Sequence, residues 1–106
     1  MEQIILEHTV IIKLNALIDI LIDKEYFSYL ENAETYVHKL YDFIDTIPSQ
    51  PRRRTKLPRY GQYYCRYKAN AQTSYYITFD VVQDYYFIKN IISSHTRQYP
   101  VYIKGL

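Results

Sequence analysis

The spacing of apolar residues changes near the middle of this chain, and this change limits the folds open to it more than any other feature. In the first half, apolar residues recur at helical spacing in two stretches (Leu14, Leu17, Ile18, Leu21 and Ile22; then Leu30, Ala33, Val37, Leu40, Tyr41 and Ile44). After residue 61 they alternate with polar residues, as in half-buried strands. The pattern predicts an α+β fold with the helices ahead of most of the sheet.

The helix boundaries follow from flanking residues. Residues 4–13 precede the first helical stripe and are rich in β-branched side chains, which favours a strand. Asn15 is the predicted N-cap of the helix that follows. Residues 28–31 (Ser-Tyr-Leu-Glu) fit a capping box at the start of the second helix, and Pro48 and Pro51 end it. The two helices are predicted to form an antiparallel hairpin.

Three runs in the second half alternate with period two and predict strands: residues 62–69, 74–81 and 85–92. Their short connections imply antiparallel pairing. Residues 101–103 form a candidate edge strand. The order strand, helix, helix, strand, strand, strand predicts one domain over residues 1–106 with two layers, in which the helical hairpin covers one face of a mainly antiparallel sheet. The other face is expected to be exposed and to carry Arg66 and Lys68.

The formal net charge of +2 hides an uneven distribution. Residues 1–50 carry three lysines and nine acidic side chains, a net charge of −6, whereas residues 51–106 carry ten basic and two acidic side chains, a net charge of +8. This asymmetry indicates an anionic partner for the second half. The most basic segment is the connector, residues 48–59, with five cations (Arg52, Arg53, Arg54, Lys56 and Arg59). It is either a solvated loop or an anion-binding segment, and arginine suits bidentate phosphate contacts.

Alternation divides the first strand of the predicted meander into two faces. Tyr63 and Cys65 fall on the core side, which makes Cys65 a buried, inert thiol. Tyr64, Arg66 and Lys68 fall on the other side. This second set is either an ordinary polar face or a basic, aromatic platform on which single-stranded bases can stack.

Several classes of site find no support in the residues. One cysteine cannot form an internal disulfide, and the three histidines lack ligand spacing, so no metal or other cofactor is expected. Two glycines cannot make a glycine-rich phosphate loop. No apolar run reaches the roughly 20 residues that span a bilayer, and no signal peptide is recognised. A cytoplasmic protein without membrane contact is therefore expected.

His95 follows the last predicted strand and has Arg97 two positions further on. It is either a polar packing group or a candidate for proton transfer. Ser93 and Ser94 beside it are better interpreted as hydrogen-bonding residues at a strand end than as nucleophiles.

Five features of the chain form a recognisable combination: the order of elements, the connector, the segment 57–68 (Leu-Pro-Arg-Tyr-Gly-Gln-Tyr-Tyr-Cys-Arg-Tyr-Lys), the segment 75–80 (Tyr-Tyr-Ile-Thr-Phe-Asp) and a final strand ending at His95. In these features the chain resembles the RelE/ParE superfamily of type II toxins. The resemblance covers nearly the whole chain in architecture, and its sequence-specific part is residues 57–95. It implies a small bacterial toxin that is neutralised by a cognate antitoxin protein.

RelE-like members of that superfamily cut mRNA on the ribosome, on the sheet face opposite the helices. The resemblance implies a catalytic set of Arg66 for the phosphate, His95 for proton transfer and Lys68 beside them. The implied RNA-binding set is the five connector cations (Arg52, Arg53, Arg54, Lys56 and Arg59) with Tyr64, Arg97 and Tyr102. Tyr99 and Tyr102 are weaker alternatives for proton transfer. The implied reaction is metal-free attack of a ribose 2′-OH on the adjacent phosphate.

Other interpretations stay open at this point. ParE-like members of the superfamily inhibit DNA gyrase and need no nuclease residues. The strong arginine often found on a later strand of active RNases has no obvious counterpart here, since Lys89 and Arg97 are the only nearby cations. The chain could thus be a gyrase inhibitor, a degenerate member that only binds an antitoxin, or a general RNA-binding module.

Overall fold

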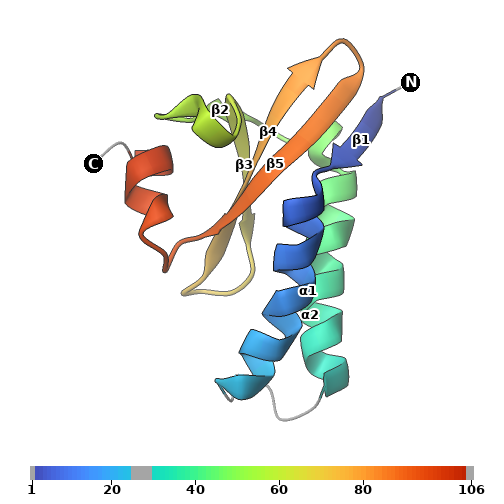
Figure 1. Ribbon diagram of the computed structural model, residues 1–106, viewed down its shortest axis with the longest axis vertical. Coiled ribbons are helices and arrows are strands. Elements are labelled where there is room, and N and C mark those ends of the chain that lie inside the picture. The colour runs from blue at the N-terminus through green and yellow to red at the C-terminus, as the bar shows by residue number, and fades with distance from the viewer. Residues whose placement is uncertain (1, 25–29, 105–106) are drawn as a thin grey trace.

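The computed structural model describes residues 2–24 and 30–104 (Figure 1). Its elements are β1 (Gln3–Leu6), α1 (His8–Asp23), α2 (Leu30–Asp45), β2 (Arg53–Arg54), β3 (Tyr63–Lys68), β4 (Ser74–Val82), β5 (Tyr85–Ser93) and a short C-terminal helix of the π type (Tyr99–Lys104). Two 3-10 turns, Ile47–Ser49 and Pro58–Tyr60, lie at the two ends of the connector.

The five strands form one open sheet in the order β1-β5-β4-β3-β2. β1 pairs with β5 in parallel, and the other three pairs are antiparallel. The α1–α2 hairpin covers one face of this sheet, so the molecule has two main layers (Figure 1). The predicted α+β class and the mainly antiparallel sheet are confirmed, although the short strand β2 inside the connector was not expected.

The core lies between the hairpin and the sheet because the two sequence periods bury complementary faces. Helical spacing turns one stripe of each helix inward (Val10, Leu14 and Leu21 from α1; Ala33, Val37, Leu40 and Ile44 from α2). Alternation turns Cys65, Ile77 and Phe79 toward them. Each such fully buried apolar side chain contributes roughly 1.5–3 kcal/mol relative to an exposed one.

The first helix begins earlier than the sequence predicts, so the strand over residues 4–13 is wrong beyond Leu6. Val10 lies one helical turn before Leu14 and is 1% exposed, and its burial outweighs the modest strand preference of its neighbours. Glu7 occupies the N-cap position. Asn15 lies inside the helix instead of capping it, and its Oδ1 accepts a hydrogen bond from the Tyr41 hydroxyl at 3.4 Å.

The second helix follows the predicted stripe, with two exceptions. Its buried positions are all predicted ones, but Tyr41 is only half-buried and Leu30 at its first position is 57% exposed. The predicted capping box depends on Ser28, which lies outside the described residues. The helix ends at Asp45, shortly before Pro48.

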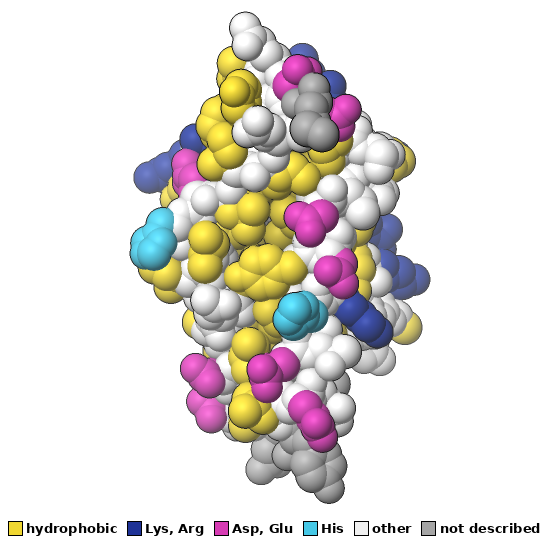
Figure 2. Space-filling model, turned by 90° about the vertical axis from the view of Figure 1, so that its right-hand side faces the viewer, with side chains coloured by type: hydrophobic (Ala, Val, Ile, Leu, Met, Phe, Trp, Pro, Cys, Tyr) yellow, Lys and Arg dark blue, Asp and Glu magenta, His cyan; other side chains and the backbone are white. Residues whose placement is uncertain are grey.

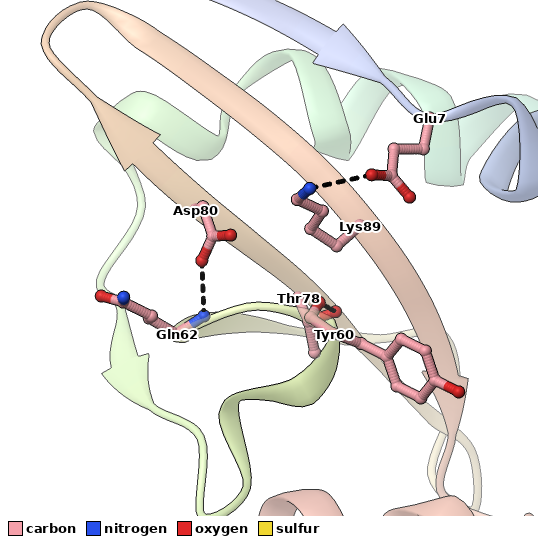
Figure 3. A network of polar contacts seen from close by, with 6 residues as sticks. All are labelled: Glu7, Tyr60, Gln62, Thr78, Asp80 and Lys89. Carbon is pink, nitrogen blue, oxygen red and sulfur yellow. Dashed lines mark hydrogen bonds and ion pairs between the residues drawn. The ribbon is translucent and has the colours of Figure 1, made fainter.

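The ladder between β4 and β5 carries one irregularity. Its register shifts between Thr78 and Phe79, which pair with Asn90 and Ile88, and this leaves Lys89 as the extra residue of a bulge. Lys89 forms an ion pair with Glu7 at 2.9 Å (Figure 3). The contact ties the end of β1 to the bulge.

A lysine with a partly buried ammonium group supports the same bulge from the helical layer. Lys13 of α1 donates to Asn90 Oδ1 at 2.8 Å and to the Ile91 carbonyl at 3.0 Å. Burial lowers the pKa of Lys13 from its ordinary value. Both acceptors would lack this partner without the lysine, which explains a cation at the edge of an apolar core.

The second sheet face, opposite the hairpin, is called here the open face. Residues 60–62, which follow the connector, cross it (Figure 3). The Thr78 hydroxyl donates to the Tyr60 carbonyl at 2.7 Å, and the Gln62 amide donates to Asp80 Oδ1 at 2.8 Å. These bonds fix the segment that links the connector to β3 against β4, so the open face is less exposed than predicted.

The C-terminal helix covers another part of the open face. Residues 101–103 lie in this helix and do not form the predicted edge strand. Ile103 packs with Tyr76 and Ile92 in a second apolar cluster, separate from the main core. Pro100 has no amide proton to give to a strand ladder, whereas a helical turn tolerates it.

The outer face of the hairpin has a different character. Apolar side chains occupy its centre, with acidic side chains around them (Figure 2). Exposed acids of the two helices include Asp19, Asp23, Glu31, Glu34, Asp42 and Asp45. The negative charge of the first half of the sequence therefore lies mainly on the helical layer, and the positive charge of the second half lies on the rest of the molecule. Among residues 2–24 and 30–104, no helix is long and apolar enough to cross a membrane.

Candidate functional site

A cleft of about 520 Å³ opens on the open face and is called here the open-face cleft. Three cations line it, and each comes from a different element: Arg53 from β2, Arg66 from β3 and Lys104 from the C-terminal helix. The other lining residues are Phe43, Gln50, Pro51, Tyr64, Tyr76, Tyr99 and Ile103. No Asp or Glu is among the described residues of this lining, so the cleft suits an anionic ligand.

Arg66 is the cation that the sheet positions most directly. It lies in the middle of β3 opposite Tyr76 and is exposed. Its Nε lies 3.2 Å from the Ser74 hydroxyl oxygen, to which it donates. The bond holds the guanidinium plane near β4 and uses only one of its five N–H donors, so most of the fork can contact a phosphate.

Aromatic rings line the same cleft in contact with one another. Tyr76 packs against Tyr64 with ring centroids 5.7 Å apart, and it stacks on Tyr99 at 4.9 Å. Burial and then the nearby Tyr99 hydroxyl raise the pKa of Tyr76 to about 12. The Tyr76 phenol is therefore neutral at ordinary pH and can act as a proton donor but not as a base.

The connector cations divide between two sides. Arg53 pairs in register with Tyr64 and lines the open-face cleft. Arg52 and Arg54 instead lie over the ring of Tyr63, at 4.7 and 5.3 Å from its centroid. The Tyr63 ring packs against the main core, so these two arginines stand away from the cleft. Successive side chains of a strand point to opposite faces, so Arg53 is separated from Arg52 and Arg54 although the three are adjacent in the sequence.

The two cations at the end of the connector also lie outside the cleft lining. Lys56 is exposed, and its backbone amide donates to the Tyr102 carbonyl at 2.8 Å. Arg59 lies over the ring of Tyr60, which in turn contacts the ring of Tyr102 at 5.4 Å. This group joins the connector to the C-terminal helix beside the cleft.

Two further predicted residues are exposed at the far end of the sheet. Lys68 ends β3 opposite Ser74, and Arg97 precedes the C-terminal helix. Neither lines the open-face cleft. The structure thus brings together Arg53, Tyr64 and Arg66 from the predicted set.

His95 lies in a different place from Arg66. Its Nε2 is 3.0 Å from the Thr73 hydroxyl, and it lines a second cleft formed with the hairpin. Arg66 is held by Ser74, the next residue along the chain. Neighbouring positions at the start of a strand point to opposite faces of the sheet. The structure therefore separates the residue predicted for proton transfer from the residue predicted for the phosphate.

Six lining residues are absent from the predicted site, and two of them, Tyr76 and Lys104, carry ionisable side chains. Tyr76 could have been found, because alternation puts it on the same face as Arg66 and on the next strand. Lys104 could not, because the tail was predicted as an edge strand and only its helical turn brings the ammonium to the cleft.

Cys65 lies under the open-face cleft, on the core side of β3. It is 2% exposed, and its thiol donates to the Pro51 carbonyl at 3.3 Å. Burial raises the pKa of Cys65 to about 11, against a smaller opposite effect of Arg52. The prediction of a buried thiol is confirmed.

Within residues 2–24 and 30–104, no group of three or more His, Cys, Asp or Glu side chains could hold a metal ion. No family model, no curated protein and no solved structure matches the chain.

Proposed function

We propose that this chain is a toxin of the RelE/ParE type, that it cuts mRNA on the ribosome, and that the open-face cleft is its RNA site. The observation that carries the proposal is the convergence of Arg53, Arg66 and Lys104 with stacked tyrosines in one cleft whose described lining has no carboxylate. Cations suit the phosphates of RNA, and phenol rings suit its bases. Most of the cleft lining belongs to the sheet face away from the helical hairpin, where the resemblance to RelE-like toxins puts the cleavage site, and Phe43 of α2 borders the cleft at the sheet edge.

The proposed reaction is an internal transfer at one phosphate. The ribose 2′ oxygen attacks the adjacent phosphorus and loses its proton to water, the bond from phosphorus to the 5′ oxygen breaks, and that oxygen takes up a proton. The products are a 2′,3′-cyclic phosphate and a 5′-OH end. Negative charge grows on the phosphate oxygens during the attack, and a guanidinium held in place before the reaction stabilises it.

Arg66 and Tyr99 are assigned the two main roles. The Ser74 hydroxyl holds Arg66 with several N–H groups left for the phosphate. Tyr99 lines the same cleft and stacks on Tyr76, so its phenol can give a proton to the departing 5′ oxygen. Tyr99 was the weaker alternative to His95 on sequence grounds, and the shared cleft now favours it.

Expression in bacteria tests the assignment. We expect the wild-type chain to arrest growth and to produce new 5′-OH ends in mRNA. Arg66→Ala should reduce cleavage by about 100-fold or more, the size of effect seen when one charge-stabilising donor is lost. Tyr99→Phe should reduce it by roughly 100-fold, the lower end for a proton-transfer group.

Matched variants control for general damage. Arg54→Ala removes an arginine that lies over Tyr63 outside the cleft, and Tyr85→Phe removes an exposed hydroxyl of the β4–β5 hairpin. Both should cut at the wild-type rate. His95→Ala should cost less than tenfold, and a larger loss would return His95 to the catalytic set.

The same experiment separates the alternatives. Growth arrest with intact mRNA and inhibited supercoiling by DNA gyrase would replace the nuclease proposal with a ParE-like one. RNA binding without cleavage or toxicity would indicate a simple RNA-binding module.

The proposal includes a cognate antitoxin protein as partner. An acidic segment of that partner would complement the second half of the chain, whose net charge is +8. Co-expression of a short neighbouring reading frame with an acidic tail should restore growth and form a complex that co-purifies with this chain.

A further inference from the structure

The second cleft has about 570 Å³ of space and lies on the hairpin side of the sheet, distinct from the open-face cleft. It is called here the helix-side cleft. It opens between the last turns of α1 and the turn that joins β3 to β4, which Figure 1 shows facing each other. Its volume is in the range of clefts that enclose small molecules.

The two walls of the helix-side cleft differ in chemistry. One wall is apolar and comes from α1, with Leu17, Ile20 and Leu21. The opposite wall is polar and comes from the sheet end and the segment after it (Asn70, Gln72, Thr73, Ser93, His95 and Thr96). A ligand that fills this space must therefore be amphipathic.

Two phenols form the floor between these walls. The Tyr36 hydroxyl bonds to the Tyr75 hydroxyl at 3.0 Å, with the rings edge to face at 6.1 Å. Tyr75 is 6% exposed and Tyr36 is half-buried, and burial is the main cause that raises the pKa of Tyr36. The floor is therefore partly shielded from water.

The charge of the lining selects the sign of the ligand. Lys24 and His95 line the cleft, and no described lining residue carries a carboxylate. Within residues 2–24 and 30–104, Lys89 and Glu7 form an ion pair, and no carboxylate of these residues forms one with Lys24. An ammonium and an imidazole at the rim can both donate to an anionic group.

We propose that the helix-side cleft binds a small apolar carboxylic acid, with its apolar body against α1 and its carboxylate toward Lys24 and His95. An aliphatic chain and a flat aromatic ring share this chemistry. Octanoate and 1-naphthoate serve as probes of the two kinds, and 1-octanol and 1-naphthalenemethanol serve as their neutral counterparts.

Isothermal titration calorimetry of the full chain tests the proposal. At least one of the two acids should bind with a stoichiometry of one and at least tenfold more tightly than its alcohol, and the tighter acid identifies the body that fits. Lys24→Gln should weaken that binding about tenfold, as expected for a lost charge-assisted hydrogen bond, while Lys24→Arg should retain it. Lys39→Gln removes an exposed lysine from α2, outside the lining, and should have no effect.

A second pair of variants tests the apolar wall. Ile20→Glu adds a negative charge to the lining and should abolish binding. Ile12→Glu changes another exposed isoleucine of α1, outside the lining, and should not. Amide shifts of Thr73 and Thr96 in NMR spectra should follow the titration. Absence of binding by both acids, equal binding of acid and alcohol, or unchanged binding by Ile20→Glu would overturn the proposal.

The outcome is independent of the proposed nuclease function. Arg66→Ala should leave binding of the acid unchanged, because Arg66 lines the other cleft. Ile20→Glu should leave mRNA cleavage unchanged for the same reason.

Discussion

Gly61 holds a conformation that other residues rarely adopt. It has a φ of 135° and passes so close to β4 that an added Cβ would lie 2.7 Å from the Phe79 nitrogen. That neighbour is backbone inside a sheet and cannot move aside cheaply. Glycine is required here by both its free rotation and its lack of a side chain.

Gly61→Ala should therefore lower the free energy of unfolding by about 1–3 kcal/mol or more, the usual cost of a strained backbone. Urea denaturation followed by circular dichroism measures this change. Gln62→Ala is the matched control, because the contact of Gln62 with Asp80 uses its backbone amide. Equal midpoints for Gly61→Ala and the wild type would contradict the strain argument.

Cys65 links stability to pH in the alkaline range. Its pKa is about 11 in the folded chain against 9.0 for the ordinary thiol, with burial as the main cause. A folded-state pKa above the unfolded value means that the folded chain keeps its proton while the unfolded chain loses it. The resulting stability is complete below pH 9 and is lost as the pH rises toward 11.

The expected loss from Cys65 between pH 9 and 11 is on the order of 2 kcal/mol. The free energy of unfolding of the wild type should fall over this range more steeply than that of Cys65→Ala, which has no thiol to ionise. Tyr76, whose pKa is raised to about 12, adds a decline at higher pH that both proteins share. Parallel curves between pH 9 and 11 would show that the thiol is not the cause.

Among the elements, the C-terminal helix closes one side of the open-face cleft. Ile103 is 6% exposed and anchors it against Tyr76 and Ile92. Ile103→Asp should release the helix and speed amide hydrogen exchange in residues 99–104 by tenfold or more, because a charge cannot stay unpaired in an apolar cluster. It should also weaken the proposed binding of RNA. Val101→Asp, on the exposed side of the same helix, should leave both measurements unchanged.

The elements also explain what the sequence could and could not predict. The three strands of the meander were located within about one residue, because alternation and burial agree there. The start of α1 was missed because Val10 belongs to both a β-branched run and a helical stripe, and only its contact with the core decides between them. The C-terminal helix was missed because it is held by contacts across the open face and has little pattern of its own.

The candidate site was predicted in part for similar reasons. Alternation within one strand was enough to place Tyr64 and Arg66 together. His95 contacts Thr73, so its position depends on the sheet face to which the Thr73 side chain points at the end of the β3–β4 turn. The pairing of the neighbouring strands sets that direction. Local patterns therefore predict the residues of a strand face, whereas residues at turns and chain ends need the assembled sheet.

For the whole molecule, separation of charge predicts how binding responds to salt. Each phosphate neutralised on single-stranded RNA adds about −0.7 to the slope of log affinity against log salt concentration. The three cations of the open-face cleft should give a slope of roughly −2 by the same relation, and Arg66→Ala should make it shallower by about 0.7. Fluorescence anisotropy of a labelled oligonucleotide at several salt concentrations measures this slope. Glu31→Gln on the hairpin should leave it unchanged, and a slope near zero for the wild type would contradict phosphate binding.

The parallel pairing of β1 with β5 also affects how fast the chain can fold and at what stage of its synthesis folding can finish. The ion pair between Glu7 and Lys89 joins residues 82 positions apart, so contacts between the two strands close a loop that spans most of the chain. Such distant contacts slow folding, while the β3–β4 and β4–β5 hairpins need only local turns. During synthesis, the hairpin helices emerge before any strand of the meander and wait with their apolar faces uncovered. The core is completed only after β5 leaves the ribosome. The newly made chain therefore needs its last strand before it can bury the apolar faces of its helices.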